Sequence, residues 1–179
     1  MLYIKEEDVG KLLPMSVALE AVEEVLRLHG QGKAVNITRS RVRLPNNVLH
    51  VMSGGVPDLN ITGLKAYTTT RQGARFVVLL YQADTGEFLA MIEADKLGQI
   101  RTGATSGVAT RYMAREEART VGIIGTGWQA RSQLAAVCGV RSITSVKAYG
   151  RNAERRQTFC DEMVDELGVS VEPAESAEE

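Results

Sequence analysis

The most constraining feature of the sequence is the stretch from residue 121 to residue 130, which reads Val-Gly-Ile-Ile-Gly-Thr-Gly-Trp-Gln-Ala. A short apolar run ends at Gly125, and Gly127 and Ala130 complete the spacing Gly-x-Gly-x-x-Ala. This spacing is typical of a dinucleotide-binding turn: the glycines allow a tight bend and close approach of a ligand, and the small third residue lets the helix pack on its strand. Backbone N–H groups at the start of that helix attract a pyrophosphate. Taken alone, the motif also fits an ordinary turn between a strand and a helix.

Residues 118–179 show the alternation of strands and helices that such a turn requires. Apolar runs predict strands at 120–125, at 143–149 and from about Val169, and helical spacing predicts helices at 127–138 and 152–167. This order is a βαβ unit. A nucleotide-binding half needs three strands, and the complete fold has two halves. We therefore expect residues 118–179 to be the first part of a Rossmann-type domain, and the chain to be a truncated enzyme or a shortened gene product.

Residues 1–117 have a different pattern. Helical spacing predicts helices at 16–30, with Ser16 as a plausible N-cap, and at 95–114. Apolar runs and turn residues predict strands at 1–4, 37–44, 48–53, 61–70, 76–82 and 88–93. Consecutive strands joined by short turns favour an antiparallel or mixed sheet. The predicted fold class is α/β, with an N-terminal α+β domain at 1–117 followed by an incomplete Rossmann-type dinucleotide-binding domain at 118–179.

The net charge bears on which partners are expected, and the cysteines bear on the cellular compartment. The formal net charge of −1 gives no reason to expect nucleic acid or an anionic membrane as a partner. No apolar run approaches the roughly 20 residues that a membrane-spanning helix needs. Cys138 and Cys160 are the two cysteines, and neither belongs to a Cys-x-x-Cys pattern. We expect reduced thiols, a cytoplasmic location and no metal site; a disulfide between the two cysteines is the alternative.

The residues after the second predicted strand of this unit bear on the choice of cofactor. An enzyme that prefers NAD usually places Asp or Glu there, on the ribose hydroxyls. This chain has Gly150, Arg151 and Asn152 instead. A guanidinium suits a 2′-phosphate, so the cofactor prediction is NAD(P) with a leaning toward NADP. The alternative is that Arg151 is only a solvated residue at the start of the next helix.

Three basic residues of the first 117 are candidates for holding a carboxylate. Arg39 and Lys65 lie in predicted strands, and Arg101 lies on the helix before the nucleotide unit. Cations from three elements could converge on one carboxylate substrate. On spacing alone the simpler interpretation is a set of solvated side chains, because Arg41 and Arg43 follow Arg39 on the same strand.

Three motifs together resemble the ornithine cyclodeaminase/mu-crystallin family. They are Gly-Leu-Lys-Ala-Tyr at 63–67, Gln-Ile-Arg-Thr-Gly-Ala-Thr-Ser at 99–106, and Gly-Thr-Gly-Trp-Gln-Ala at 125–130. Their order and spacing match, and the resemblance covers essentially the whole chain. It implies an oxidoreductase or deaminase that uses a nicotinamide cofactor on small α-amino or α-imino acids. Alanine dehydrogenase, ketimine or pyrroline-2-carboxylate reductase, and ornithine cyclodeaminase are the activities it implies.

The resemblance also assigns roles to individual residues. It implies that Lys65 is catalytic and that the substrate is bound by Arg39, Met52, Lys65 and Arg101. Arg41 is an alternative to Arg39, because it lies two residues away on the same face. The cofactor-binding residues it implies, with the two selectivity residues added, are Thr102, Gly125, Thr126, Gly127, Trp128, Gln129, Ala130, Arg151 and Asn152. Residues 1–117 then form the substrate-binding and dimerisation domain of a homodimer.

The sequence departs from the family pattern in two places. His50 stands where the cyclodeaminases have the glutamate that holds the side-chain amine of ornithine, which argues against ornithine as the substrate. The catalytic aspartate of the family falls beyond residue 179. We therefore expect no turnover from residues 1–179 alone. The alternative function is a catalytically inactive fragment, or an NADP-binding protein of the mu-crystallin type.

Overall fold

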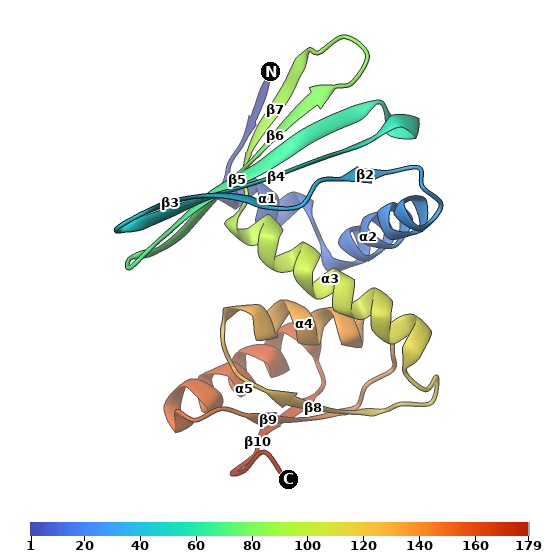
Figure 1. Ribbon diagram of the computed structural model, residues 1–179. Coiled ribbons are helices and arrows are strands. Elements are labelled where there is room, and N and C mark those ends of the chain that lie inside the picture. Colours follow the sequence, from blue (N-terminus) through green and yellow to red (C-terminus); the bar gives the residue numbers. More distant parts are fainter. Residues whose placement is uncertain (179) are drawn as a thin grey trace. The chain divides into compact units, whose positions relative to one another are not determined.

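The computed structural model describes residues 1–178, which fall into two compact units (Figure 1). The first unit comprises Met1–Pro14 and Glu23–Gly98; the second comprises Met15–Val22 and the chain from Gln99 onward. Helices α2 (Met15–Gly30) and α3 (Asp95–Met113) each contribute residues to both units. The main division between the two compact units therefore falls after residue 98, and not after residue 117, where the sequence predicted a functional boundary. That functional boundary stays a prediction.

The first unit is built on a seven-stranded sheet with the order β1-β7-β6-β5-β4-β2, in which β3 also pairs with β4. Its strands are β1 (Leu2–Ile4), β2 (Val35–Asn36), β3 (Ser40–Leu44), β4 (Asn47–Val56), β5 (Ile61–Thr70), β6 (Gly73–Gln82) and β7 (Phe88–Glu93). Strand β1 runs parallel to β7, and all other pairs are antiparallel. The prediction of an antiparallel or mixed sheet is confirmed.

In the first 44 residues, one helix was missed and two local predictions are wrong. Helix α1 (Glu6–Leu12) was not predicted, because Val9 is its one buried residue and a single apolar contact leaves no periodic signal. Pro14 rather than Ser16 is the N-cap of α2, and no side chain caps the helix among the described residues. The strand expected at 37–44 begins only at Ser40 as β3, and a separate two-residue strand, β2, precedes the expected range.

The two faces of the first sheet have different neighbours. Val78 and Leu80 of β6 pack with Val9 of α1 and with Ala90 and Ile92 of β7 in the core of this unit. Because side chains alternate along a strand, Leu64 and Ala66 of β5 and Val77 and Leu79 of β6 point to the opposite face. We call these the helix-facing face and the open face. The four residues of the open face are only half-buried.

The second unit contains the predicted βαβ arrangement. Strands β8 (Thr120–Ile124), β9 (Ser145–Tyr149) and β10 (Ser170–Pro173) form a parallel sheet in the order β10-β9-β8. Helices α4 (Trp128–Cys138) and α5 (Ala153–Leu167) connect them. The core consists of residues from both helices and all three strands, with Phe159, Leu134, Met163 and Val146 almost completely buried. The α/β fold class, with a βαβ unit after an α+β part, is confirmed.

Close contact between α3 and α4 stabilises the second unit. A Cβ atom on Gly103 would lie 2.2 Å from the carbonyl oxygen of Ser132, and one on Gly107 would lie 2.9 Å from that of Ala136. Gln99, which is 2% exposed, donates a hydrogen bond from its side chain to the carbonyl of Trp128. Gly103, inside the Arg-Thr-Gly-Ala-Thr-Ser motif, and Gly107, directly after it, therefore let the backbones of α3 and α4 come into contact.

Three further predictions concern features that span the whole chain. Cys160 is buried and Cys138 is half-buried, and the two are not joined by a disulfide in this structure; the expectation of reduced thiols stays a prediction. Within residues 1–178, no helix has the length and apolar character to cross a membrane. No group of three or more His, Cys, Asp or Glu side chains in the same range is arranged to hold a metal ion.

Candidate functional site

The turn between β8 and α4 has the geometry that its glycines predict. Gly125 has a φ angle of +103°, which residues with a side chain rarely adopt. No atom lies within 4 Å of the position that a Cβ atom would take on Gly125 or Gly127, so a ligand has room to approach this backbone. Ala130, at the third position of the motif, is buried in the core between α4 and the sheet.

A cavity of about 440 Å³ opens at this turn. It is lined by Ile123, Ile124, Gly125, Gly127, Gln129, Ala130 and Gln133. Gly127 is the N-cap of α4 and offers no side-chain cap, so the positive end of the helix dipole faces the cavity without a competing side chain from the described residues. These residues fit the pyrophosphate of a dinucleotide.

Thr126 fills the place that an acidic residue would need at the end of β9. A Cβ atom on Gly150 would lie 2.5 Å from Oγ1 of Thr126. The N–H of Gly125 donates to the carbonyl of Tyr149 at 2.7 Å, which fixes the turn against the end of β9. Glycine stands where NAD-dependent enzymes usually have the Asp or Glu that contacts the ribose. An acidic side chain at this position would fit only if the side chain of Thr126 moved.

Arg151 and Asn152 follow this position and are both exposed. Oδ1 of Asn152 accepts a hydrogen bond from the backbone N–H of Arg155 at 2.8 Å and caps α5. The buried Arg156 donates to the carbonyl of Gly150 at 3.1 Å and to Glu175 at 2.9 Å. Hydrogen bonds to Gly150 and to Asn152 thus fix the backbone on either side of Arg151. Asn152, which the sequence suggested as a cofactor-binding residue, acts in this structure as the N-cap of α5.

Arg101 and Thr102 lie on the part of α3 that packs against the beginning of α4. Their neighbours Gln99 and Gly103 make the contacts to Trp128 and Ser132. Arg101 is exposed and Thr102 is half-buried. Trp128, although it belongs to the fingerprint, is 56% exposed. The second unit therefore gathers the predicted cofactor residues near the ends of β8 and β9 and beside the first turn of α4.

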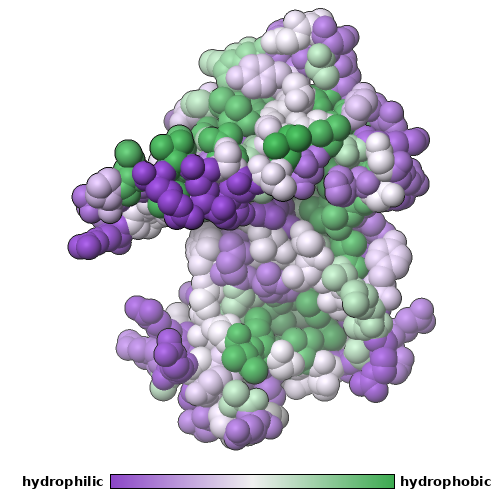
Figure 2. Space-filling view, viewed as in Figure 1, coloured by the Kyte–Doolittle hydropathy of each residue, from purple (hydrophilic) through white to green (hydrophobic). Residues whose placement is uncertain are grey.

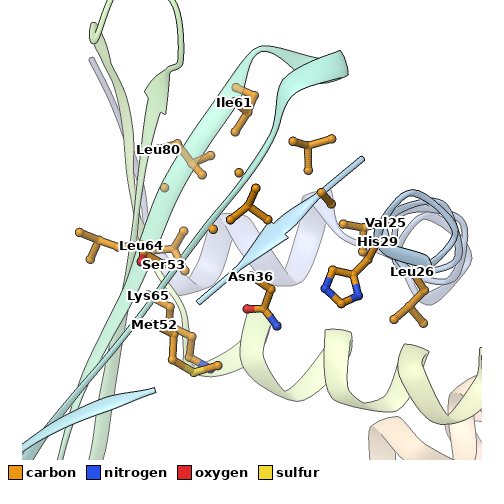
Figure 3. Close-up of a pocket in the computed structure, with 17 residues that line it drawn as sticks. Val25, Leu26, His29, Asn36, Met52, Ser53, Ile61, Leu64, Lys65 and Leu80 are labelled. Atoms are coloured by element: carbon orange, nitrogen blue, oxygen red, sulfur yellow. The ribbon is translucent and has the colours of Figure 1, made fainter. Parts of the chain in front are cut away.

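Lys65 and Met52 are neighbours on the helix-facing face of the first sheet. They are register partners on β5 and β4, and Figure 3 shows their side chains extending side by side. Nζ of Lys65 lies 4.7 Å from the ring centre of Phe76 and 5.4 Å from that of Tyr67. The two aromatic rings attract the ammonium group and fix its position.

The aromatic platform continues onto β4. The rings of Tyr67 and Phe76 stack at 4.6 Å, and His50 stacks on the other side of Tyr67 at 4.3 Å. Arg39 also reaches this platform, with Cζ 5.7 Å from the ring centre of Tyr67. Arg39, Met52 and Lys65 are thus brought together around Tyr67. Sequence reasoning missed the stack; the alternation Lys65-x-Tyr67 on one strand is the signal that could have revealed it.

His50 is a half-buried imidazole surrounded by positive charge. Its Nε2 lies 3.2 Å from Oγ1 of Thr69, and its Nδ1 has no hydrogen-bond partner among the described residues. Partial desolvation, followed by the positive charges of Arg41, Arg39 and Arg43, holds the pKa of His50 below its ordinary value. The imidazole is therefore favoured in its neutral form.

A cavity of about 430 Å³ adjoins Lys65 and Met52 on the same face. Most of its lining is apolar, with Val25 and Leu26 of α2 on one side and Val78 and Leu80 of β6 on the other. His29, on the last turn of α2, faces the cavity in Figure 3. Lys65 supplies the one cationic group of this lining.

Comparison with known proteins identifies the family to which the chain belongs. A sequence model of the ornithine cyclodeaminase/mu-crystallin family matches residues 2–179. A Δ1-pyrroline-2-carboxylate reductase of Bacillus cereus is 32% identical over 177 residues, covering 94% of this chain and 54% of that protein.

Two solved structures have the same fold as this chain. The reductase of Thermococcus litoralis, in complex with NADH and L-proline, has a TM-score of 0.92 at 33% identity and is matched over 99% of this chain and 58% of its own. An archaeal alanine dehydrogenase dimer with bound NAD has a TM-score of 0.91 at 29% identity, matched over 97% of this chain and 56% of its own. The chain spans about half the length of the curated relatives it matches. It belongs to the ornithine cyclodeaminase/mu-crystallin family.

Proposed function

We propose that this chain is the substrate-binding and nucleotide-binding part of an NAD(P)-dependent oxidoreductase or deaminase that acts on small α-amino or α-imino acids. The observation that carries the proposal is the family match over residues 2–179, in which the fingerprint turn and Lys65 both have usable geometry. A bound nicotinamide would supply or accept a hydride at the α-carbon of the substrate. The residues of this chain would bind and orient both partners.

The proposed role of Lys65 is to hold the substrate carboxylate and polarise the imine. Its ammonium group is positioned by Tyr67 and Phe76, and preorganised charge of this kind favours the transition state. Arg39, which shares the Tyr67 platform, would bind the same carboxylate. Met52 would line the pocket, and Arg101 would contribute a second guanidinium.

The proposed cofactor is NADP(H). A Cβ atom on Gly150 would meet Oγ1 of Thr126, so an acid at this position would require Thr126 to move, and the exposed Arg151 follows directly. A guanidinium pairs with a 2′-phosphate through two parallel hydrogen bonds. Thr102 and the residues from Gly125 to Ala130 would hold the phosphates and the nicotinamide side.

We also propose a homodimer that forms through the open face of the first sheet. Leu64, Ala66, Val77 and Leu79 are half-buried there, and apolar patches of this kind are typical of interfaces. The two free thiols support a cytoplasmic location for the protein.

The test measures cofactor binding first and turnover second. Fluorescence titration of this chain should show tighter binding of NADPH than of NADH. Arg151→Ala should weaken NADPH binding about tenfold and leave NADH binding unchanged, since a hydrogen bond to a charged group is worth about 1.5–3 kcal/mol. Arg71→Ala, which removes an exposed arginine from the first unit, is the matched control.

Turnover is followed at 340 nm with Δ1-pyrroline-2-carboxylate, or with pyruvate and ammonia. Activity that disappears in Lys65→Ala supports the enzyme. Cofactor binding without turnover is the result expected for residues 1–179 alone, and it fits both the nucleotide-binding part of an enzyme and the second candidate, an NADP-binding protein of the mu-crystallin type. Failure to bind either cofactor contradicts both functions.

A further inference from the structure

The segment from residue 39 to residue 82 has a charge opposite to the rest of the chain. It contains six basic residues (Arg39, Arg41, Arg43, Lys65, Arg71 and Arg75) and one acidic residue, Asp58. The remaining residues hold 15 basic and 21 acidic side chains. Strands β3, β4, β5 and β6 contain no acidic residue. A surface of one charge sign attracts ligands of the opposite sign.

The cations of β3 gather on the same face as Lys65. Arg41 is the register partner of His50, which in turn is the partner of Tyr67. Partners across a sheet point to the same face, so Arg41 lies on the helix-facing face together with Lys65. Figure 2 shows a hydrophilic band along β3. Within residues 1–178, Arg39, Arg41 and Arg43 form no ion pair.

The spacing between Arg39 and Arg41 is set by the chain, because the two arginines are two residues apart. Arg41 pairs with His50 on β4, and Lys65 lies beyond β4, on β5. Two residues of an antiparallel strand span roughly 7 Å. This distance suits the two carboxylates of a dicarboxylic amino acid with four or five carbons. The positive charges of all three arginines contribute to lowering the pKa of His50, so the three guanidinium groups lie near the same imidazole.

We propose that Arg41 binds a second carboxylate of the substrate, and that the protein acts on α-amino or α-imino dicarboxylic acids. Lys65 and Arg39 hold the α-carboxylate, and Arg41 holds the carboxylate of the side chain, with Arg43 adding to the positive potential. This assignment rests on the proposed function and names its substrate class. It also excludes ornithine and lysine, because their side-chain ammonium groups would meet the arginines of β3.

The experiment compares pairs of ligands that differ only in charge. Isothermal titration calorimetry of the full chain measures the binding of L-aspartate against L-asparagine and of L-glutamate against L-glutamine. We expect the acid of each pair to bind about tenfold more tightly, as for a hydrogen bond to a charged group. Arg41→Gln should abolish this preference and leave amide binding unchanged. Lys65→Met should weaken the binding of all four ligands.

Arg75→Gln is the matched control. Arg75 pairs with Thr68, next to Tyr67 in sequence, and therefore points to the open face. Its substitution removes the same charge from the same sheet and should leave the preference for the acids intact.

Each contrary result has a distinct meaning. Equal binding of acids and amides by the wild-type chain overturns the dicarboxylate assignment and leaves the amino acid site in place. A preference that survives Arg41→Gln overturns the role of Arg41. Equal loss of aspartate and asparagine binding in Arg41→Gln would put Arg41 at the α-carboxylate and overturn the second-carboxylate assignment. Binding of none of the four ligands contradicts the proposed function itself, and the substrate class falls with it.

Discussion

Gly103→Ala should destabilise the second unit, because the new methyl group has no room. Its Cβ atom would lie 2.2 Å from the carbonyl oxygen, 2.5 Å from the carbonyl carbon and 2.8 Å from Cβ of Ser132. All three atoms belong to a residue that is 6% exposed and fixed within α4. Relief of the overlap requires α3 and α4 to move apart by about 1 Å, since carbon–carbon contacts are optimal only at about 3.5–4.0 Å.

The magnitude follows from two opposing effects. Overpacking of a well-packed contact costs about 1–3 kcal/mol, and a clash with backbone belongs at the upper end. Alanine in place of glycine within a helix returns about 1 kcal/mol. The expected net loss in the free energy of unfolding is therefore about 2 kcal/mol. For a chain of this size, each kcal/mol lowers Tm by about 2–4 °C, so we expect a decrease of about 4–8 °C.

Thermal unfolding followed by circular dichroism measures this change. Gly10→Ala is the control, because Gly10 lies within α1 and a Cβ atom there would have no neighbour within 4 Å. That variant should be as stable as the wild type or slightly more stable. A Gly103→Ala variant that matches Gly10→Ala in Tm would refute the close-packing argument for the Arg-Thr-Gly-Ala-Thr-Ser motif.

Two other predictions concern the end of α3 and the open face. The guanidinium of Arg141 donates to the carbonyls of Thr110, Arg111, Ala114 and Arg115 at 2.8–3.0 Å and caps α3; Arg141→Ala should cost about 2–3 kcal/mol. Hydrogen exchange should then show faster exchange in the last turn of α3, and unchanged protection there would contradict the capping role. Sedimentation at micromolar concentration should show a dimer that Val77→Asp, on the open face, converts to a monomer. Val164→Asp, on the exposed side of α5, should remain dimeric, whereas a monomeric wild type would count against the interface.

Several features of this protein are determined by local sequence. The fingerprint at 121–130 gave the strand, turn and helix correctly, because a tight turn with φ near +103° requires glycine and the helix requires a small residue on its inner side. Strands 61–70 and 88–93 were predicted with their observed bounds. Turn residues lie beside both strands, so the local sequence signals where they begin and end.

The candidate site depends on contacts that no local pattern contains. Arg39, Lys65 and His50 converge on Tyr67 only through the register of β4, β5 and β6. Register is a property of paired strands, and a shift by one residue would send Lys65 to the open face. The sequence therefore supplied the residue types of the site, while strand pairing determined which of them meet.

The same distinction holds for helix contacts and cofactor selectivity. The sequence showed Gly103 and Gly150 but gave no reason for either glycine. The structure supplies one: Ser132 occupies the space beside Gly103, and Thr126 occupies the space beside Gly150. Helix α1 likewise depends on distant residues, since the carboxylate of Glu6 accepts hydrogen bonds from the backbone of Asp95 and Lys96. Local sequence determines which elements form, and steric fit between distant segments determines where glycine is required and which side chains can act together.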